Sequence, residues 1–305
     1  MNTKCLPWTG CLLFAWIFLF SSAWAGQVVT QENKAWARKA VEGEKALKAP
    51  TPQNSLAVLY FKNQTGQSEL DPLQKGIALL LITDLSKVKG LQVVERVQLQ
   101  ALAEELGLGA SGLVDPGTAP RMGNLLGSRW IVGGDILKGK IDELRIQSRP
   151  LEVMTQKILG EPFSEGQLRD LFRIEKEILF DLINLLKIEV TPPEQEALQK
   201  PCSMNLRALT DLFRAIEASD RGQYKQAGEL YEAALQEDAR ICLARESLQE
   251  LKALRLVRGK KSREVLRSLR DQTSLTDQLS PEDPGKRAKT PKDVTTPSSI
   301  RIIFP

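Results

Sequence analysis

The sequence contains no histidine. Histidine is the most frequent general base in enzymes, the usual proton shuttle near neutral pH and the commonest metal ligand. Without it the usual serine or cysteine triads cannot be completed, so we expect this protein not to be an enzyme. The formal net charge of +4 is small for 305 residues, and it gives no reason to expect a nucleic-acid partner.

Cysteine is also scarce, with four residues in the whole chain. Two of them lie in an N-terminal segment that we expect to be removed. The remaining two, Cys202 and Cys242, are too few to hold a structural metal ion. Each begins or precedes a helix, and these helices should lie side by side, so an oxidising compartment favours a disulfide between them. The sequence therefore predicts a Cys202–Cys242 disulfide and no metal or cofactor.

The N-terminal residues have the three parts of a secretory signal peptide. Lys4 supplies the positive charge, residues 11–20 are apolar, and Ala23-Trp24-Ala25 is a small-x-small cleavage site before Gly26. The apolar segment is shorter than the ~20 residues that span a bilayer, which disfavours the alternative of a retained anchor. Because the apolar segment follows Cys11, that cysteine does not stand in a lipoprotein signal. We expect an unlipidated periplasmic protein, cleaved after Ala25.

Apolar periodicity predicts alternating strands and helices in the middle of the chain. Strands are expected at residues 55–61, 93–94, 130–132, 144–147 and 157–159. Helices are expected at residues 31–48, 71–90, 99–106, 120–127 and 168–186, the last with Phe172 in its buried stripe. Pro150 cannot donate a ladder hydrogen bond, which indicates an edge position or a bulge. The predicted fold class is α/β (α+β), a mixed β-sheet covered by helices.

Several short sequence motifs between Val94 and Asp135 occur in a particular order. Val94-Glu95-Arg96 closes a strand, Ser111–Asp115 follows a helix, and Leu125-Leu126-Gly127 precedes a strand that ends in Gly133-Gly134-Asp135. In this order they resemble the CsgG family of curli assembly and transport components and the related TolB N-terminal-like domains. The resemblance extends over residues 56–186, a little under half of the chain.

The resemblance implies a role in secretion, because the best-known members of the family form an oligomeric ring in the outer membrane that exports amyloid subunits. Their pore comes from two inserted hairpins, and each membrane strand needs ~9–11 residues. Only Ile136–Lys140 stands at the first insertion point and Gly160–Glu165 at the second. The segments that would form a pore are therefore missing from this chain.

The functional prediction is a non-enzymatic, periplasmic, outer-membrane-associated assembly or transport component that acts by protein–protein interaction. Its expected partners are envelope or exported proteins, with no nucleic acid; a homo-oligomer and a peripheral contact with the outer membrane stay open. The alternatives are a subunit of an oligomeric outer-membrane secretion channel and a periplasmic regulator of a cell-wall synthase, and fold alone cannot choose among them.

The chain becomes helical after a polar linker. Gly222, Tyr224, Ala227, Tyr231 and Ala234 have the offsets of a tetratricopeptide repeat (TPR), with Gly222 in the turn between two helices. One such repeat needs a further helix to cover its apolar face. An ordinary helical hairpin is the alternative. In either case we expect Tyr224 and Tyr231 to contribute to a partner-binding surface.

The C-terminal tail holds 11 Lys and Arg residues against 6 Asp and Glu residues, with several prolines. A solvated, disordered tail is one interpretation, and attraction of Arg258, Lys260, Lys261 and Arg263 to an anionic surface is the other. The chain ends in an apolar segment in which Ile300, Ile302 and Phe304 would share one face of a strand. We predict that these three side chains bind a partner by adding a strand to a sheet edge, the one near Pro150 being the candidate.

The predicted organisation assigns one role to each part of the chain. It comprises a signal peptide (1–25), an N-terminal helical arm (26–54), a CsgG-like α/β domain (55–190), a linker (191–203), a TPR-like helical module (204–257) and a basic, proline-rich tail (258–305).

Overall fold

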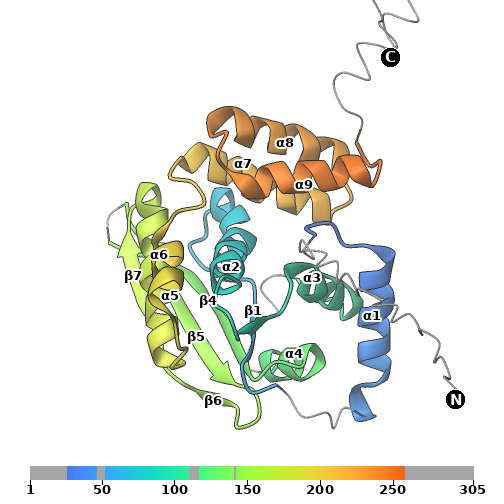
Figure 1. The fold of residues 1–305 in the computed structure, drawn as a ribbon, viewed down its shortest axis with the longest axis vertical. Coiled ribbons are helices and arrows are strands. Elements are labelled where there is room, and N and C mark those ends of the chain that lie inside the picture. The colour runs from blue at the N-terminus through green and yellow to red at the C-terminus, as the bar shows by residue number, and fades with distance from the viewer. Residues whose placement is uncertain (1–25, 47–51, 110–116, 141, 258–305) are drawn as a thin grey trace, which may run out of the picture. The chain divides into compact units, whose positions relative to one another are not determined.

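A seven-stranded mixed sheet and the helices around it make up the part of the chain that the computed structural model describes, residues 26–46, 52–109, 117–140 and 142–257 (Figure 1). The α/β prediction with a mixed, helix-covered sheet is confirmed. The strands are β1 (Ser55–Val58), β2 (Lys62–Asn63), β3 (Gln92–Val93), β4 (Trp130–Lys138), β5 (Leu144–Glu152), β6 (Lys157–Ile158) and β7 (Phe163–Gly166). The helices are α1 (Gln31–Glu42), α2 (Pro72–Leu85), α3 (Arg96–Glu105), α4 (Ala119–Leu126), α5 (Leu171–Leu185), α6 (Pro192–Gln199), α7 (Leu206–Asp220), α8 (Tyr224–Glu237) and α9 (Cys242–Ala253).

The sheet has the strand order β3-β1-β4-β5-β6, with β2 paired to β4 and β7 paired to β5. β3, β1 and β4 run parallel, whereas β5 is antiparallel to β4, β6 and β7. All four residues of β1 are buried, as expected for a central strand covered on both faces. β5 instead alternates buried and half-buried positions from Leu144 to Pro150, which matches the alternation read from the sequence.

Pro150 does not lie at an edge of the sheet. It is opposite Val132 in the β4–β5 ladder, and its carbonyl oxygen accepts a hydrogen bond from the Leu159 amide on the other side. The strand beyond β5 is interrupted at this level, because β6 ends at Ile158 and β7 begins at Phe163. The missing N–H of the proline faces this interruption, so the sheet tolerates it without an edge. The edge near Pro150 that the sequence suggested for strand addition is therefore already covered.

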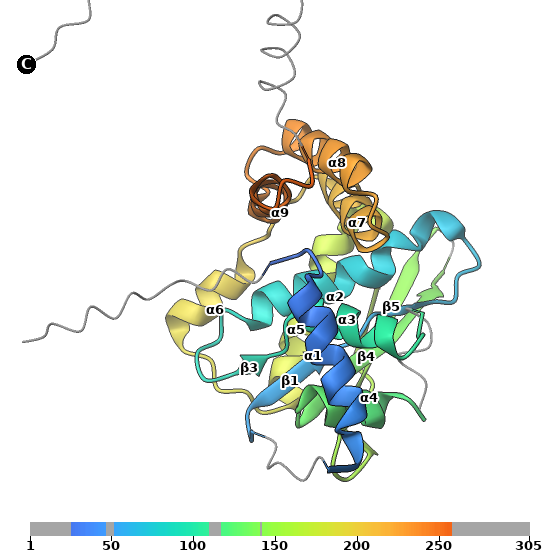
Figure 2. The ribbon, with the colours of Figure 1, turned by 90° about the vertical axis from the view of Figure 1, so that its right-hand side faces the viewer.

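Several helix ends lie where local chemistry places them. Pro72 opens α2 and Pro120 stands in the first turn of α4, where a missing N–H costs nothing. α4 ends at Gly127, which adopts the left-handed conformation (φ 63°) that a glycine favours. At the other end of the chain, Thr30 and Asn33 form reciprocal side-chain caps at the start of α1. Figure 2 shows α1 lying over α3.

The segment predicted as a polar linker contains a helix, α6. Its two prolines, Pro192 and Pro193, occupy the first turn, where they are tolerated. Thr191 and Glu194 form a capping box, and Glu194 also accepts a hydrogen bond from the Lys89 amide at 2.7 Å. These bonds lower the pKa of Glu194 to about 2, the side-chain bond from Thr191 contributing most. Proline is thus a helix-starting signal here rather than a break.

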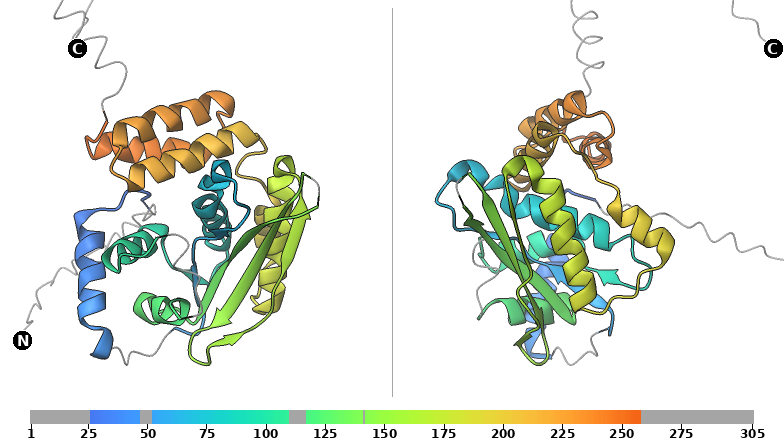
Figure 3. Two further views of the ribbon diagram at one scale, coloured as in Figure 1. Left: turned by 180° about the vertical axis from the view of Figure 1, so that it is seen from behind. Right: turned by 90° about the vertical axis from the view of Figure 1, so that its left-hand side faces the viewer.

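Helices α7, α8 and α9 form a separate layer at one end of the sheet domain (Figures 1 and 3). α7 and α8 pack closely against each other, and α7 also packs against α2. The contact with α2 is tight: a Cβ atom placed on Gly76 would overlap the ring of Phe213. The helical layer is therefore packed directly on the α/β layer, and the described residues between 26 and 257 lie in one compact unit. Among the helices of the described ranges, none has the length and apolar character needed to cross a membrane.

Candidate interaction surface

Arg96, the last residue of the Val94-Glu95-Arg96 phrase, lies at the centre of a buried polar cluster. Its side chain has no solvent exposure and pairs with Asp220 of α7, whose side chain is 2% exposed, at 2.9 Å. The guanidinium also donates to the Tyr60 hydroxyl at 3.2 Å and to the Gln27 carbonyl oxygen at 2.5 Å. Asp220 also forms an ion pair with the Lys75 ammonium, with Nζ 2.6 Å from Oδ2. This Arg96 cluster joins the N-terminal arm, the sheet domain and the helical layer.

The Arg96 cluster stabilises the fold. Burial raises the pKa of the Tyr60 hydroxyl, which donates to Gln100 at 2.8 Å. Arg96 and Asp220 are enclosed and face each other's opposite charge, which is how proteins accommodate buried ions, whereas Lys75 is partly exposed. A reactive group would need access to a substrate. The cluster therefore holds the layers together and does not form an open site.

A second polar cluster lies between α2 and α5. Lys176 bonds to Asp84 and lies 3.3 Å from Glu175. Burial raises the pKa of Glu175 to about 8, and the negative charge of Asp84 adds to this while Lys176 opposes it. One Glu175 oxygen has no hydrogen-bond partner in the described part of the chain. Glu175 is therefore enclosed in the core with its pKa raised above the usual range of a glutamate.

The structure brings the two predicted disulfide cysteines together. Cys202 lies half-buried before α7, and Cys242 is the exposed first residue of α9. Both are free thiols in this structure. A hydrogen bond between them lowers the pKa of Cys242 and, together with burial, raises that of Cys202. The thiols are neighbours across 40 positions of sequence, and the disulfide stays a prediction.

The two tyrosines of the helical layer are not equivalent. Tyr224 is half-buried at the start of α8. Tyr231 is fully buried between the helices, so its ring cannot belong to the partner-binding surface predicted for it. A tyrosine at this spacing fills the contact between helices. The predicted anionic-surface residues Arg258, Lys260, Lys261 and Arg263 and the terminal Ile300, Ile302 and Phe304 all lie outside the described residues.

An open groove runs along the outer side of α5 beside β7. Its volume is about 640 Å³. Phe163 of β7 and Phe172 and Phe180 of α5 line it together with charged residues and Gln199. The Phe163 side chain is 48% exposed, and the Arg145 guanidinium lies 3.7 Å from its ring centroid. β7 pairs with β5, and no second strand covers its other side among the strands described.

The exposed ring of Phe163 and the partly exposed rings of Phe172 and Phe180 distinguish this Phe163–Phe172–Phe180 groove from the closed clusters. Exposed apolar surface with a polar rim is typical of sites where another protein binds. Two other exposed apolar side chains, Met154 and Ile158, at 80% and 48%, do not line the groove. The groove is therefore the best candidate in this structure for contact with a partner.

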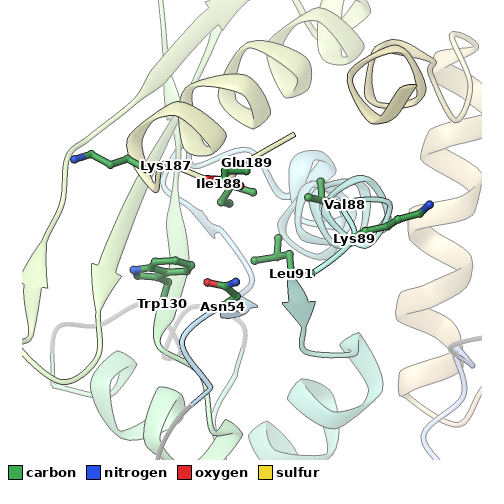
Figure 4. Close-up of a pocket in the computed structure, with 9 residues that line it drawn as sticks. Asn54, Val88, Lys89, Leu91, Trp130, Lys187, Ile188 and Glu189 are labelled. Carbon is green, nitrogen blue, oxygen red and sulfur yellow. The ribbon is translucent and has the colours of Figure 1, made fainter. Parts of the chain in front are cut away.

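A smaller pocket of about 410 Å³ lies at the N-terminal ends of β1 and β4. Figure 4 shows the side chains of Trp130, Asn54 and Leu91 around it, whereas the ammonium groups of Lys89 and Lys187 point away on opposite sides. The pocket does not gather the convergent charged groups that catalysis requires. Nor does any group of three or more histidine, cysteine, aspartate or glutamate residues suited to a metal occur in the ranges that the structure describes.

Comparison with known families identifies the central segment. Residues 38–138, from the second half of α1 to the end of β4, match the family described as Curli production assembly/transport component CsgG. The resemblance to CsgG is confirmed. The CsgG-like segment contains the Val94-Glu95-Arg96 phrase and the Arg96 guanidinium of the buried cluster, whereas the groove lies beyond its end. The Ser111–Asp115 phrase lies outside the described residues, and no comparison addresses the TPR assignment.

Individual relatives are distant. The chain is 27% identical over 176 residues to "Putative adenylate cyclase 3" of Rhizobium meliloti (strain 1021), covering 55% of this chain and 28% of that protein's length. The LpoB C-terminal domain from Salmonella enterica shares 16% identity, covers 44% of this chain and 94% of its own, and has a TM-score of 0.30. Lipoprotein GNA1162 from Neisseria meningitidis shares 13% identity over 45% of this chain and 99% of its own, with a TM-score of 0.33.

The sequence reading missed the groove because it placed Phe172 in the buried stripe of α5. In the structure Leu171, Ile178 and Leu182 are buried, whereas Phe172 is partly exposed. A signal was present: Phe172 and Phe180 are eight residues apart, which puts them on one helix face, offset from the leucine stripe. The partnership of Arg96 and Asp220 had no such signal, because they are 124 residues apart.

Proposed function

We propose that this protein is a non-enzymatic, periplasmic, outer-membrane-associated component of envelope assembly or export that acts by binding another protein. The observation that carries the proposal is the groove lined by Phe163, Phe172 and Phe180, which exposes aromatic surface beside an uncovered strand. The match of residues 38–138 to the CsgG family supports the envelope context, because that family is described as an assembly and transport component.

The non-enzymatic part of the proposal rests on the available chemistry. The chain has no histidine, and the strongly perturbed carboxyl of Glu175 is enclosed between helices rather than exposed in a cleft. General acid–base catalysis needs a titratable group within hydrogen-bond reach of a substrate. The name of the Rhizobium relative gives the activity to test first. Purified protein incubated with ATP and either Mg²⁺ or Mn²⁺ should form no more cyclic AMP than heat-inactivated protein, and protein-dependent cyclic AMP would overturn this part.

The binding role can be tested at the groove itself. A photoreactive benzoylphenylalanine at position 163 should crosslink to an envelope or exported protein when intact cells are illuminated. Phe180→Ser, which removes the opposite wall, should reduce that adduct at least several-fold while the protein stays folded. Met154→Ser is the matched control, because Met154 is 80% exposed but does not line the groove. An adduct unaffected by Phe180→Ser, or equally reduced by Met154→Ser, would remove the groove as the binding site.

A further inference from the structure

The first described residues of the chain are held by a carboxylate from the far end of the fold. Glu250 of α9 accepts hydrogen bonds from the backbone amides of Gln27, at 2.6 Å, and Val28, at 3.3 Å. The two segments are 223 positions apart in sequence. Successive backbone amides that point to one side form a concavity that binds an anionic group. Glu250 thus receives the N-terminal arm.

Further contacts fix the same segment on its other side. Arg96 donates from Nη2 to the Gln27 carbonyl oxygen at 2.5 Å and from Nε to the Gln27 side-chain oxygen at 2.8 Å. Val28 is only 5% exposed, and Thr30 caps α1 two residues later. These contacts fix the backbone of Gln27 and Val28, and with it the position of the preceding residue, Gly26.

Gly26 lies directly against the Glu250 carboxyl group. A Cβ atom placed on Gly26 would overlap Glu250 Oε1 and lie 3.1 Å from Cδ. The backbone nitrogen is bonded to the same Cα at about 1.46 Å, so it lies within a few ångströms of this carboxylate. Any side chain larger than hydrogen would have to displace Glu250. The site therefore has room for a glycine. A positively charged nitrogen on Gly26 would lie close to the negatively charged Glu250 carboxylate.

Gly26 is also the residue that follows the predicted cleavage site. We propose that Glu250 is the binding site for the mature N-terminus, and that cleavage after Ala25 creates its ligand, the Gly26 ammonium. A signal peptidase would use one water to hydrolyse the Ala25–Gly26 amide, leaving a carboxylate on Ala25 and an ammonium on Gly26. No oxidant or reductant is needed. In the uncleaved chain the same nitrogen is a neutral amide.

The charge balance at Glu250 favours this ligand. Within the described ranges Glu250 forms no ion pair, whereas the nearby Arg96 has Asp220 as its counter-ion. An ammonium within about 4 Å stabilises a carboxylate more than neutral amide donors do. Processing would then fasten α1 to the helical layer by an ion pair that the precursor lacks. This inference rests on the predicted cleavage and is independent of the proposed function.

The test compares chain ends in a double-mutant cycle on the mature chain, residues 26–305. One form begins at Gly26, and the other carries one additional alanine, which moves the ammonium away from Glu250. Each is made with Glu250 intact, with Glu250→Gln, and with Glu246→Gln as a control one turn earlier on the same helix. At pH 6.5 the extension should lower the thermal midpoint by about 2–4 °C when Glu250 is present, the shift that about 1 kcal/mol produces in a domain of this size.

The three backgrounds separate the outcomes. The extension penalty should persist in Glu246→Gln and fall below about 1 °C in Glu250→Gln, because that variant has no charge for the ammonium to meet. An equal penalty in all three backgrounds, or none in any, would overturn the proposal. Intact-mass measurement on protein exported from the full-length gene should give a chain beginning at Gly26. Another N-terminus would also overturn it, whatever the melting data show.

Discussion

Replacing Asp220 with asparagine should destabilise the protein more than any other change that keeps the size of a side chain in this region. Asp220 is 2% exposed and serves two cations, Arg96 at 2.9 Å and Lys75 at 2.6 Å. Asparagine has nearly the same shape and can still accept hydrogen bonds, but it carries no charge. Asp220→Asn therefore leaves the fully buried Arg96 guanidinium without its counter-ion.

The magnitude follows from the burial of the pair. Removing one partner of a buried ion pair costs about 3–5 kcal/mol, because the remaining charge stays in a poorly solvated place. Asparagine keeps part of the hydrogen bonding, and Lys75 is 16% exposed and can turn toward water, so we expect the lower end, about 3 kcal/mol. For a domain of this size such a loss lowers the thermal midpoint by roughly 6–12 °C.

Urea unfolding followed by circular dichroism measures the loss directly, as a lower midpoint at unchanged slope. Glu217→Gln is the matched control on the same helix. Glu217 pairs with Arg221 at 2.5 Å, but the side chains are 25% and 63% exposed, so the change should stay within about 0.5 kcal/mol. If Asp220→Asn shifts the midpoint no more than this control, the Arg96 cluster is not enclosed in solution and the reasoning fails.

Three further outcomes follow from other parts of the fold. Burial raises the pKa of Glu175 to about 8 from its usual 4.5, so between these pH values the folded state holds a proton that the unfolded state releases. The free energy of unfolding should therefore fall as pH rises from about 4.5 to 8. Glu175→Gln should reduce this dependence of unfolding free energy on pH, measured by urea unfolding, and an unchanged dependence would contradict the assignment. Free-thiol labelling after folding under oxidising conditions should give no signal from Cys202 and Cys242, and Cys202→Ser should remove up to about 4 kcal/mol of stability, whereas two labelled thiols would contradict the disulfide. Planar bilayers with purified protein should show no conductance steps, because the connection between β4 and β5 spans only residues 139–143; reproducible steps would favour the channel alternative.

Local signals predicted much of the α/β layer. Pro120 and Gly127 enclose α4 almost to the residue, and the alternation at Leu144–Ile146 marks β5. These succeed because the cause lies within a few residues: a missing N–H, a left-handed backbone or a one-sided strand. The sequence analysis missed α6 within the linker segment although the signal was equally local, since Thr191 and Glu194 have the spacing of a capping box.

Long-range pairing could not be predicted in this way. A strand proline lacks its hydrogen-bond donor, which indicates a sheet edge, yet the later chain folds back as β6 and β7 and leaves a gap opposite Pro150. Tyr231 was assigned to a surface, but whether that face of α8 is covered depends on α7 and α9. The ion pair of Arg96 with Asp220 likewise depends on how distant helices dock. Burial and pairing at these residues depend on how distant elements pack, and a single sequence does not show that packing.

The contact between Gly76 and Phe213 determines where the protein can be divided. The ring of Phe213 fills the space that a side chain at position 76 would occupy, so each helix supplies part of the other's surface. A fragment ending before α7 would expose this strip of α2 to water and leave Arg96 and Lys75 without Asp220. Fragment boundaries for expression or for domain exchange should therefore fall after Val257 and not between α6 and α7. An insertion meant to separate the two layers would need to reshape position 76 first.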